Sequence, residues 1–110
     1  MATSIVHRDD PGIKWYLISL VLNTQAFGAP PSGSNCYQSK QFTFNKEVSW
    51  QTSFICSAMT QNDAIETHIV PVSSTVGRLS MSNMRNTAQA ATIARAFFLS
   101  TDPNLTVSWS

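Results

Sequence analysis

Charged side chains are scarce in this chain. They make up 12% of its 110 residues, against roughly 25% in an average soluble domain. The formal net charge is +1 and the basic residues are scattered, without a run. Long-range electrostatic attraction of nucleic acid by one copy is therefore excluded. Copies of the chain also repel one another little, so self-association is expected.

Uncharged polar residues take the place of the missing charges, because the chain holds 15 Ser, 11 Thr, 7 Asn and 6 Gln. Disordered chains are usually charge-rich and poor in aromatics, whereas this one has three Trp and six Phe. It should therefore fold. Its length suits one domain spanning residues 1–110.

Cysteines and long apolar runs are also few. Cys36 and Cys56 form either one disulfide or two free thiols, and the apolar neighbours of Cys56 favour a buried free thiol. Two Cys and two distant His are too few for a zinc site, so no metal or cofactor is expected. The apolar run from Trp15 to Leu22 is too short to cross a bilayer, so no membrane partner is expected.

The strongest pattern is an alternation of apolar and small polar residues between Phe42 and Ala58. A period of two is typical of a β-sheet with one buried and one wet face. The segment is either one strand or a hairpin that pairs Phe44 with Val48 and Phe42 with Trp50. The wet face carries hydroxyls and amides, which suit a contact surface better than a catalytic pocket.

Other strand-like segments flank this alternation. They are Thr3–His7, Ile13–Leu22, Ala64–Val72 and Val76–Met81. The first two, joined by a turn at residues 9–12, predict an N-terminal hairpin. The alternating Leu105, Val107 and Trp109 predict a short final strand or a docked tail.

The Ala-rich segment from Thr87 to Leu99 predicts a helix. Asn86 or Thr87 can cap its start, and a turn at residues 102–104 stops it. The fold prediction is therefore α+β: an antiparallel sheet of five or six strands with an N-terminal hairpin and one C-terminal helix packed on one face. The expected core is Phe42, Phe44, Trp50, Phe54, Ile93 and Phe97. Ile93, Phe97 and Phe98 on the helix are the expected dimer or assembly interface.

One group of residues could carry chemistry. Glu66 and His68 share a face of one strand, and Arg78 lies on a neighbouring strand. A carboxylate, an imidazole and a guanidinium could form an acid–base site for phosphodiester cleavage. The alternative is that they are ordinary strand residues, and on that reading the chain is not an enzyme and has no catalytic residues.

Two segments resemble the coat proteins of single-stranded RNA bacteriophages. The first is Phe54-Ile55-Cys56-Ser57 with the turn at 61–63 and the strand ending Val70-Pro71-Val72. The second is Asn86-Thr87 with its helix and the following turn. The resemblance implies a virion protein that pairs with itself, assembles into a shell and packages single-stranded RNA against its sheet. The RNA-binding positions it implies are Ser53, Ser57 and Thr67, with Lys40 or Lys46 near phosphates.

Two alternatives stay open. Low charge, abundant hydroxyls and amides and exposed aromatics also suit a small secreted or extracellular recognition domain, lectin-like in binding carbohydrate. A small ribonuclease, built on the Glu66 group, is the third reading.

Overall fold

The computed structural model describes residues 2–7, 12–51 and 54–110. Within these ranges the chain forms β-strands and no helix. The strands are β1 (Ala2–His7), β2 (Lys14–Asn23), β3 (Tyr37–Phe44), β4 (Phe54–Thr60), β5 (Ile65–Pro71), β6 (Val76–Asn83), β7 (Ile93–Ser100) and β8 (Val107–Trp109). The strands expected at both ends of the chain and after the alternating segment are confirmed to within a few residues. In the described ranges no helix is long and apolar enough to cross a membrane.

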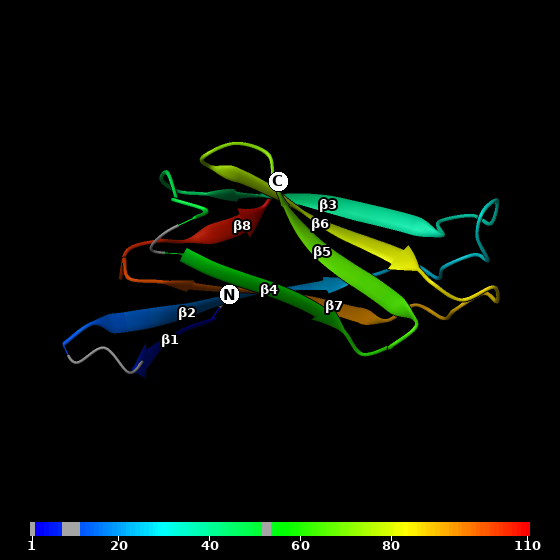
Figure 1. Cartoon of the computed structure of the whole chain (residues 1–110), viewed down its shortest axis with the longest axis horizontal. Helices are drawn as coiled ribbons and strands as arrows, with labels where there is room; N and C mark the ends of the chain where they lie inside the picture. Colours follow the sequence, from blue (N-terminus) through cyan, green and yellow to red (C-terminus); the bar gives the residue numbers. More distant parts are fainter. Residues whose placement is uncertain (1, 8–11, 52–53) are drawn as a thin grey trace.

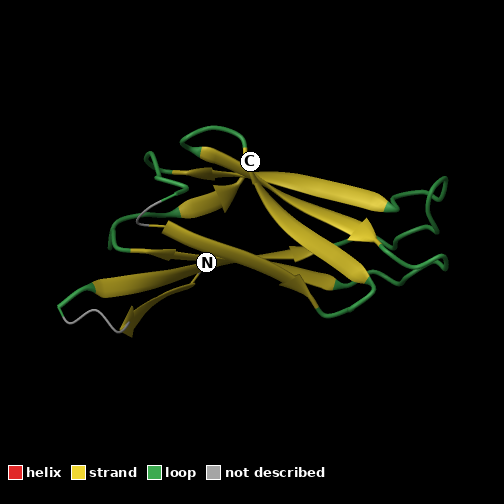
Figure 2. Ribbon diagram, viewed as in Figure 1, coloured by secondary structure: helices red, strands yellow, loops and turns green. Residues whose placement is uncertain are grey.

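The strands form two antiparallel sheets of four strands each, ordered β1-β2-β7-β4 and β5-β6-β3-β8. Figure 1 shows them as two stacked layers in a molecule of 49 × 26 × 22 Å. Figure 2 shows that loops join the strands at the two ends of these layers. The expected antiparallel pairing of β1 with β2 is present. The α+β prediction is wrong, because the fold is an all-β sandwich.

The predicted helix at Thr87–Leu99 is instead a loop followed by β7. This strand is hydrogen-bonded on both sides, to β2 and to β4. Its burial alternates residue by residue, with Ala94, Ala96 and Phe98 buried and their neighbours half-buried. Alanine has the highest helix propensity, but differences in propensity among ordinary residues are less than about 1 kcal/mol per residue and tertiary packing overrides them. A central strand gains more from its two hydrogen-bonded neighbours and from burial in the core. The small alanines also leave room for rings that enter from the facing sheet.

The alternating segment does not form one strand or a hairpin. The start of the segment belongs to β3 and its end to β4, and these two strands lie in different sheets. The chain between Phe44 and Phe54 therefore passes from one sheet to the other. Phe44 lies opposite Val107 of β8 rather than Val48. Asn45 holds the connection in place, since its side chain bonds the Asn104 carbonyl at 3.0 Å and the Thr106 amide at 2.9 Å. These long-range contacts cannot be read from a local period of two.

Aromatic rings fill the space between the sheets. Phe98 of β7 is fully buried and its ring lies 5.0 Å from that of Phe42, 5.2 Å from Phe44 and 5.7 Å from Phe54. The core prediction is confirmed for those three residues of β3 and β4. Trp50 is half-buried against this cluster. Ile93 and Phe97 were predicted in the core, and this is wrong, because they occupy the other parity of β7.

Candidate functional sites

The two sheets present outer surfaces of opposite character. Side chains alternate between the faces of a strand, so the residues between buried core positions point outward. We call the outer surface of β5, β6 and β3 the polar face; it consists of Glu66, His68, Val70, Ser82, Ser80, Arg78, Tyr37, Ser39 and Gln41. We call the outer surface of β2, β7 and β4 the apolar face; it consists of Leu17, Ser19, Val21, Leu99, Phe97, Arg95, Ile55, Ser57 and Met59.

The buried hydroxyl of Ser80 binds two side chains of the polar face. Ser80 Oγ accepts hydrogen bonds from Tyr37 Oη at 3.1 Å and from Arg78 Nε at 3.4 Å. Ser80 lies on the outer side of β6, yet it is only 6% exposed. The side chains of Tyr37 and Arg78 therefore reach it across the surface of the sheet. The Tyr37 hydroxyl and the Arg78 guanidinium therefore meet at one oxygen atom.

Glu66 and His68 lie on the same face, as the sequence predicts. His68 Nε2 is 2.6 Å from Glu66 Oε1, and both side chains are largely exposed. Register places His68 opposite Ser80 and places Arg78 one row further along β6. The expected grouping with Arg78 on one surface is therefore confirmed. The other histidine of the chain, His7, is in β1 of the other sheet.

The apolar face is a regular array. Across β2, β7 and β4 the rows are Leu17–Leu99–Ile55, Ser19–Phe97–Ser57 and Val21–Arg95–Met59. Val21, Ile55 and Met59 are 47%, 41% and 48% exposed. Arg95 is the single charge in these rows. Large exposed apolar side chains gathered on one surface of a soluble domain mark an interaction site.

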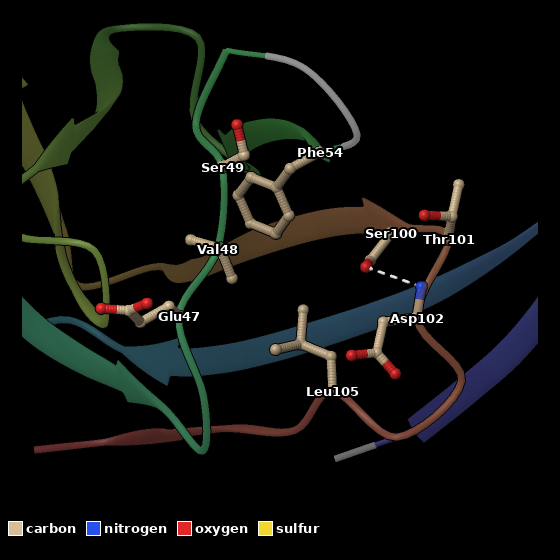
Figure 3. A pocket seen from close by; sticks show the side chains of 8 residues that line it. All are labelled: Glu47, Val48, Ser49, Phe54, Ser100, Thr101, Asp102 and Leu105. Carbon is tan, nitrogen blue, oxygen red and sulfur yellow. Dashed lines mark hydrogen bonds between the residues drawn. The ribbon is translucent and has the colours of Figure 1, made fainter.

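A pocket opens at one end of the sandwich (Figure 3). It is lined by Glu47, Val48, Ser49, Phe54, Ser100, Thr101, Asp102 and Leu105. Both carboxylates of the lining have partners, since Asp102 binds Lys46 Nζ at 2.7 Å and Glu47 accepts a hydrogen bond from Ser74. The Asp102 amide also donates to Ser100 Oγ at 3.1 Å. The Lys46 hydrogen bond, followed by that of the Asn104 amide, holds the pKa of Asp102 below its usual range. These contacts hold the turn after β7 in place, so we interpret the residues of the pocket as stabilising the fold.

The predicted RNA-binding residues do not share one surface. Lys40 is half-buried on the inner parity of β3, and Lys46 lies in a connection where Asp102 pairs with it. Ser57 lies on the apolar face of β4. Thr67 lies on the inner parity of β5 and donates to the Ala58 carbonyl at 3.0 Å. Ser53 lies outside the described residues.

Of the three residues predicted to form an interface, one lies in the core and two lie on the outer side of β7. Phe98 belongs to the core, so its assignment to an interface is wrong. Phe97 and Ile93 lie on the outer side of β7, where Phe97 stands in the middle of the apolar face. Most of that face was not predicted, because residues 93–99 were expected in a helix. The signal in the sequence was a pair of large apolar residues at odd positions of each segment, 17 and 21 in β2 and 97 and 99 in β7.

The two cysteines do not pair with each other. Cys36 and Cys56 are both free, which confirms the free thiol expected at Cys56, but Cys56 is half-buried rather than buried. Its partial burial raises the pKa of the Cys56 thiol. Across the described parts of the chain, no three His, Cys, Asp or Glu side chains come together to hold a metal ion. No family model, curated protein or solved structure matches this chain.

Proposed function

We propose that this protein is a structural subunit that assembles with copies of itself, as a coat protein in a virion does, and that two copies pair through their apolar faces. The observation that carries the proposal is the array of Leu17, Val21, Ile55, Met59 and Phe97 on the outside of one sheet. Two-sheet antiparallel domains occur among capsid proteins and also among lectins. The fold does not choose between those functions, so the argument rests on this face.

The composition of the apolar face matches that of interface cores. Such cores are rich in Phe, Met and Arg and poor in Lys, Glu and Asp. The rows contain Phe97, Met59 and Arg95 and no carboxylate. A second copy is favoured over an acidic partner because Arg95 is the one charge present. The net charge of +1 adds little repulsion between copies.

The size of the sheet meets the requirement for a stable pair. Strands lie ~4.8 Å apart and rise ~3.3 Å per residue, so the whole sheet, β1 together with the three strands of the apolar face, covers ~500 Å². Two copies together would bury ~1,000 Å², the lower limit of specific interfaces. In a two-fold pair the same surface is used twice. Arg95 of one copy can then contact the Ser19 and Ser57 hydroxyls of the other copy, and it need not lie against Arg95 of that copy.

Sedimentation velocity over a range of protein concentrations tests the pairing. The wild-type protein should sediment as a dimer or larger species at micromolar concentration. Val21→Asp and Met59→Asp should sediment as monomers, because burying a carboxylate against apolar side chains costs about 3 kcal/mol or more, roughly a hundredfold in affinity. The largest wild-type species should show closed particles by electron microscopy.

Matched controls lie outside the apolar face. Val72 is 49% exposed and Met84 63% exposed, both beyond the array. Val72→Asp and Met84→Asp add the same charge and should leave the association unchanged. A wild-type protein that stays monomeric, or equal effects of Val21→Asp and Val72→Asp, would contradict the proposal. A monomer would favour the alternative, a secreted recognition domain.

A further inference from the structure

One side of β3 is paired along only part of its length. β8 pairs with β3 from Phe42 to Phe44, and the Ser110 amide adds a hydrogen bond to the Gln41 carbonyl at 2.9 Å. Figure 1 shows β8 beside one end of β3 only. Within the described ranges no strand pairs with residues 37–40 on this side. We call this stretch, residues 37–40, the open edge.

Tyr37 and Ser39 direct their backbone groups toward the open edge. Along an antiparallel strand, successive residues bond to opposite sides. The Gln41 carbonyl and the Asn45 amide bond on the side of β8, whereas the Phe44 amide bonds on the other side, so the odd-numbered residues face β8. No backbone partner is found among the described residues for the N–H and C=O groups of residues 37 and 39 on this side. Unpaired groups in a row are a template for another strand.

Lys40 adds a positive charge to the open edge. It shares the inner parity of Phe42 and Phe44, lies opposite the fully buried Leu79 and is itself half-buried. No ion pair or hydrogen bond of its ammonium group is found in the described ranges. The carboxylates of these ranges have partners elsewhere; they are Asp102, Glu66, Asp63 and Glu47. A carboxylate for Lys40 must therefore come from another molecule.

The charge of Lys40 determines which strand fits. A strand that covers the open edge buries this ammonium group further, and burying an unpaired charge costs free energy. In antiparallel pairing, the residue opposite Ser39 exchanges both backbone hydrogen bonds with it. The residue opposite Lys40 then belongs to a non-hydrogen-bonded pair, with Cα atoms ~4.5 Å apart and side chains on one face. A Glu or Asp at that position can pair with Lys40, so an acidic strand is favoured over a neutral or basic one.

We propose that the open edge binds an extended acidic peptide of a partner protein, which joins the sheet as an antiparallel strand in line with β8 and pairs a carboxylate with Lys40. A second copy of this chain is disfavoured as the partner, because its described carboxylates are already engaged. Two other edges of the sandwich are obstructed, since Thr67 of β5 donates to the Ala58 carbonyl of β4 and β5 ends at Pro71. The apolar face belongs to the other sheet, so this site does not depend on the pairing proposed above.

NMR titration of the isotope-labelled protein with an acetylated and amidated peptide, Glu-Thr-Val-Thr-Val, tests the site. The amide protons of Tyr37 and Ser39 should shift downfield and become protected from exchange, because they gain hydrogen bonds. Those of Gln38 and Lys40 face β6 and should change little. Replacing the Glu of the peptide with Lys should weaken binding about tenfold, since an attraction becomes a repulsion. Appending the same five residues after Ser110 raises their effective concentration and should raise the Tm.

Charge reversal tests the role assigned to Lys40. Lys40→Glu should prefer the Lys peptide to the Glu peptide, a reversal that a merely structural role would not produce. Lys14→Glu changes an exposed lysine of the other sheet and should keep the wild-type preference. Val21→Asp should bind the Glu peptide as the wild type does.

Unchanged Tyr37 and Ser39 amides with both the free and the appended peptide would overturn the proposal, and so would equal affinities for the Glu and Lys peptides. Shifts confined to Val21 and Met59 would assign the peptide to the apolar face. Shifts of Tyr37 and Ser39 that follow protein concentration without peptide would assign the open edge to a second copy. Either assignment would also overturn it.

Discussion

Phe97 and Phe98 are neighbours in β7 whose rings lie on opposite surfaces of the sheet. Phe98 is fully buried among the rings of Phe42, Phe44 and Phe54. Phe97 is half-buried in the centre of the apolar face, between Ser19 and Ser57. One residue therefore contributes to the stability of the single chain, and the other is available to a second chain.

Truncating each ring separates these two contributions. Phe98→Ala should lower the free energy of unfolding by about 3–5 kcal/mol, because it leaves a cavity in the core. Phe97→Ala should lower it by about 1 kcal/mol or less, while weakening self-association. Urea denaturation gives the first quantity and sedimentation the second. Equal losses of stability in the two variants would contradict the opposite placement of the rings.

The sequence predicted the buried positions better than it predicted the arrangement of the strands. The alternation at Phe42, Phe44 and Phe54 correctly identified buried positions, because a strand's faces can be read from local spacing. It could not reveal that β3 and β4 belong to different sheets, since their partners β6, β8 and β7 are distant in the chain. The Ala-rich β7 was misread because intrinsic propensity favoured a helix and the flanking strands decided otherwise.

A candidate site was likewise predictable only where its residues lie on a single strand. Glu66 and His68 share a face because they are two residues apart, and this was read correctly. Ser80, which holds Tyr37 and Arg78, was not identified because its role depends on the register of β3 with β6. The apolar face required the neighbours of β7 to be known.

Gly77 marks a close approach inside the sandwich and provides a second prediction. A Cβ at this position of β6 would lie 2.5 Å from the Phe42 ring and 2.8 Å from Trp50. Phe42 is fully buried and packed on its other sides, so its ring has little room to move. Gly77→Ala should therefore destabilise the protein by about 1–3 kcal/mol through overpacking.

A double-mutant cycle identifies the cause of that loss. Phe42→Leu shortens the side chain that the new methyl group would meet. If the clash is responsible, Gly77→Ala should cost less in the Phe42→Leu background than in the wild type, a difference measurable by thermal or urea unfolding. Additive effects of the two substitutions would show that the ring is not the obstacle.

The ion pair of Lys46 with Asp102 predicts a stability difference that depends on pH. Lys46 Nζ lies 2.7 Å from Asp102 Oδ2 and its hydrogen bond lowers the pKa of that carboxyl group. A carboxyl whose pKa is lower in the folded than in the unfolded state stabilises the fold above the unfolded value, near pH 4, and this gain disappears as the pH falls through the folded value. Both side chains are more than a third exposed, so the gain is at most about 1 kcal/mol.

Lys46→Ala should therefore lower the free energy of unfolding at neutral pH by about 0.5 kcal/mol, and the difference from wild type should close as the pH falls through the lowered pKa of Asp102 in the folded protein. Lys14→Ala removes an exposed lysine for which no ion pair is found among the described residues, and it should show no such pH-dependent difference. Urea unfolding at a series of pH values measures both. The Asn104 amide donates to Asp102 Oδ1 at 2.8 Å, and Lys46→Ala does not remove this donor, so the pKa of Asp102 should rise only part of the way to its ordinary value. A stability difference that is constant across the pH range would mean that Lys46 acts through packing rather than through the charge of Asp102.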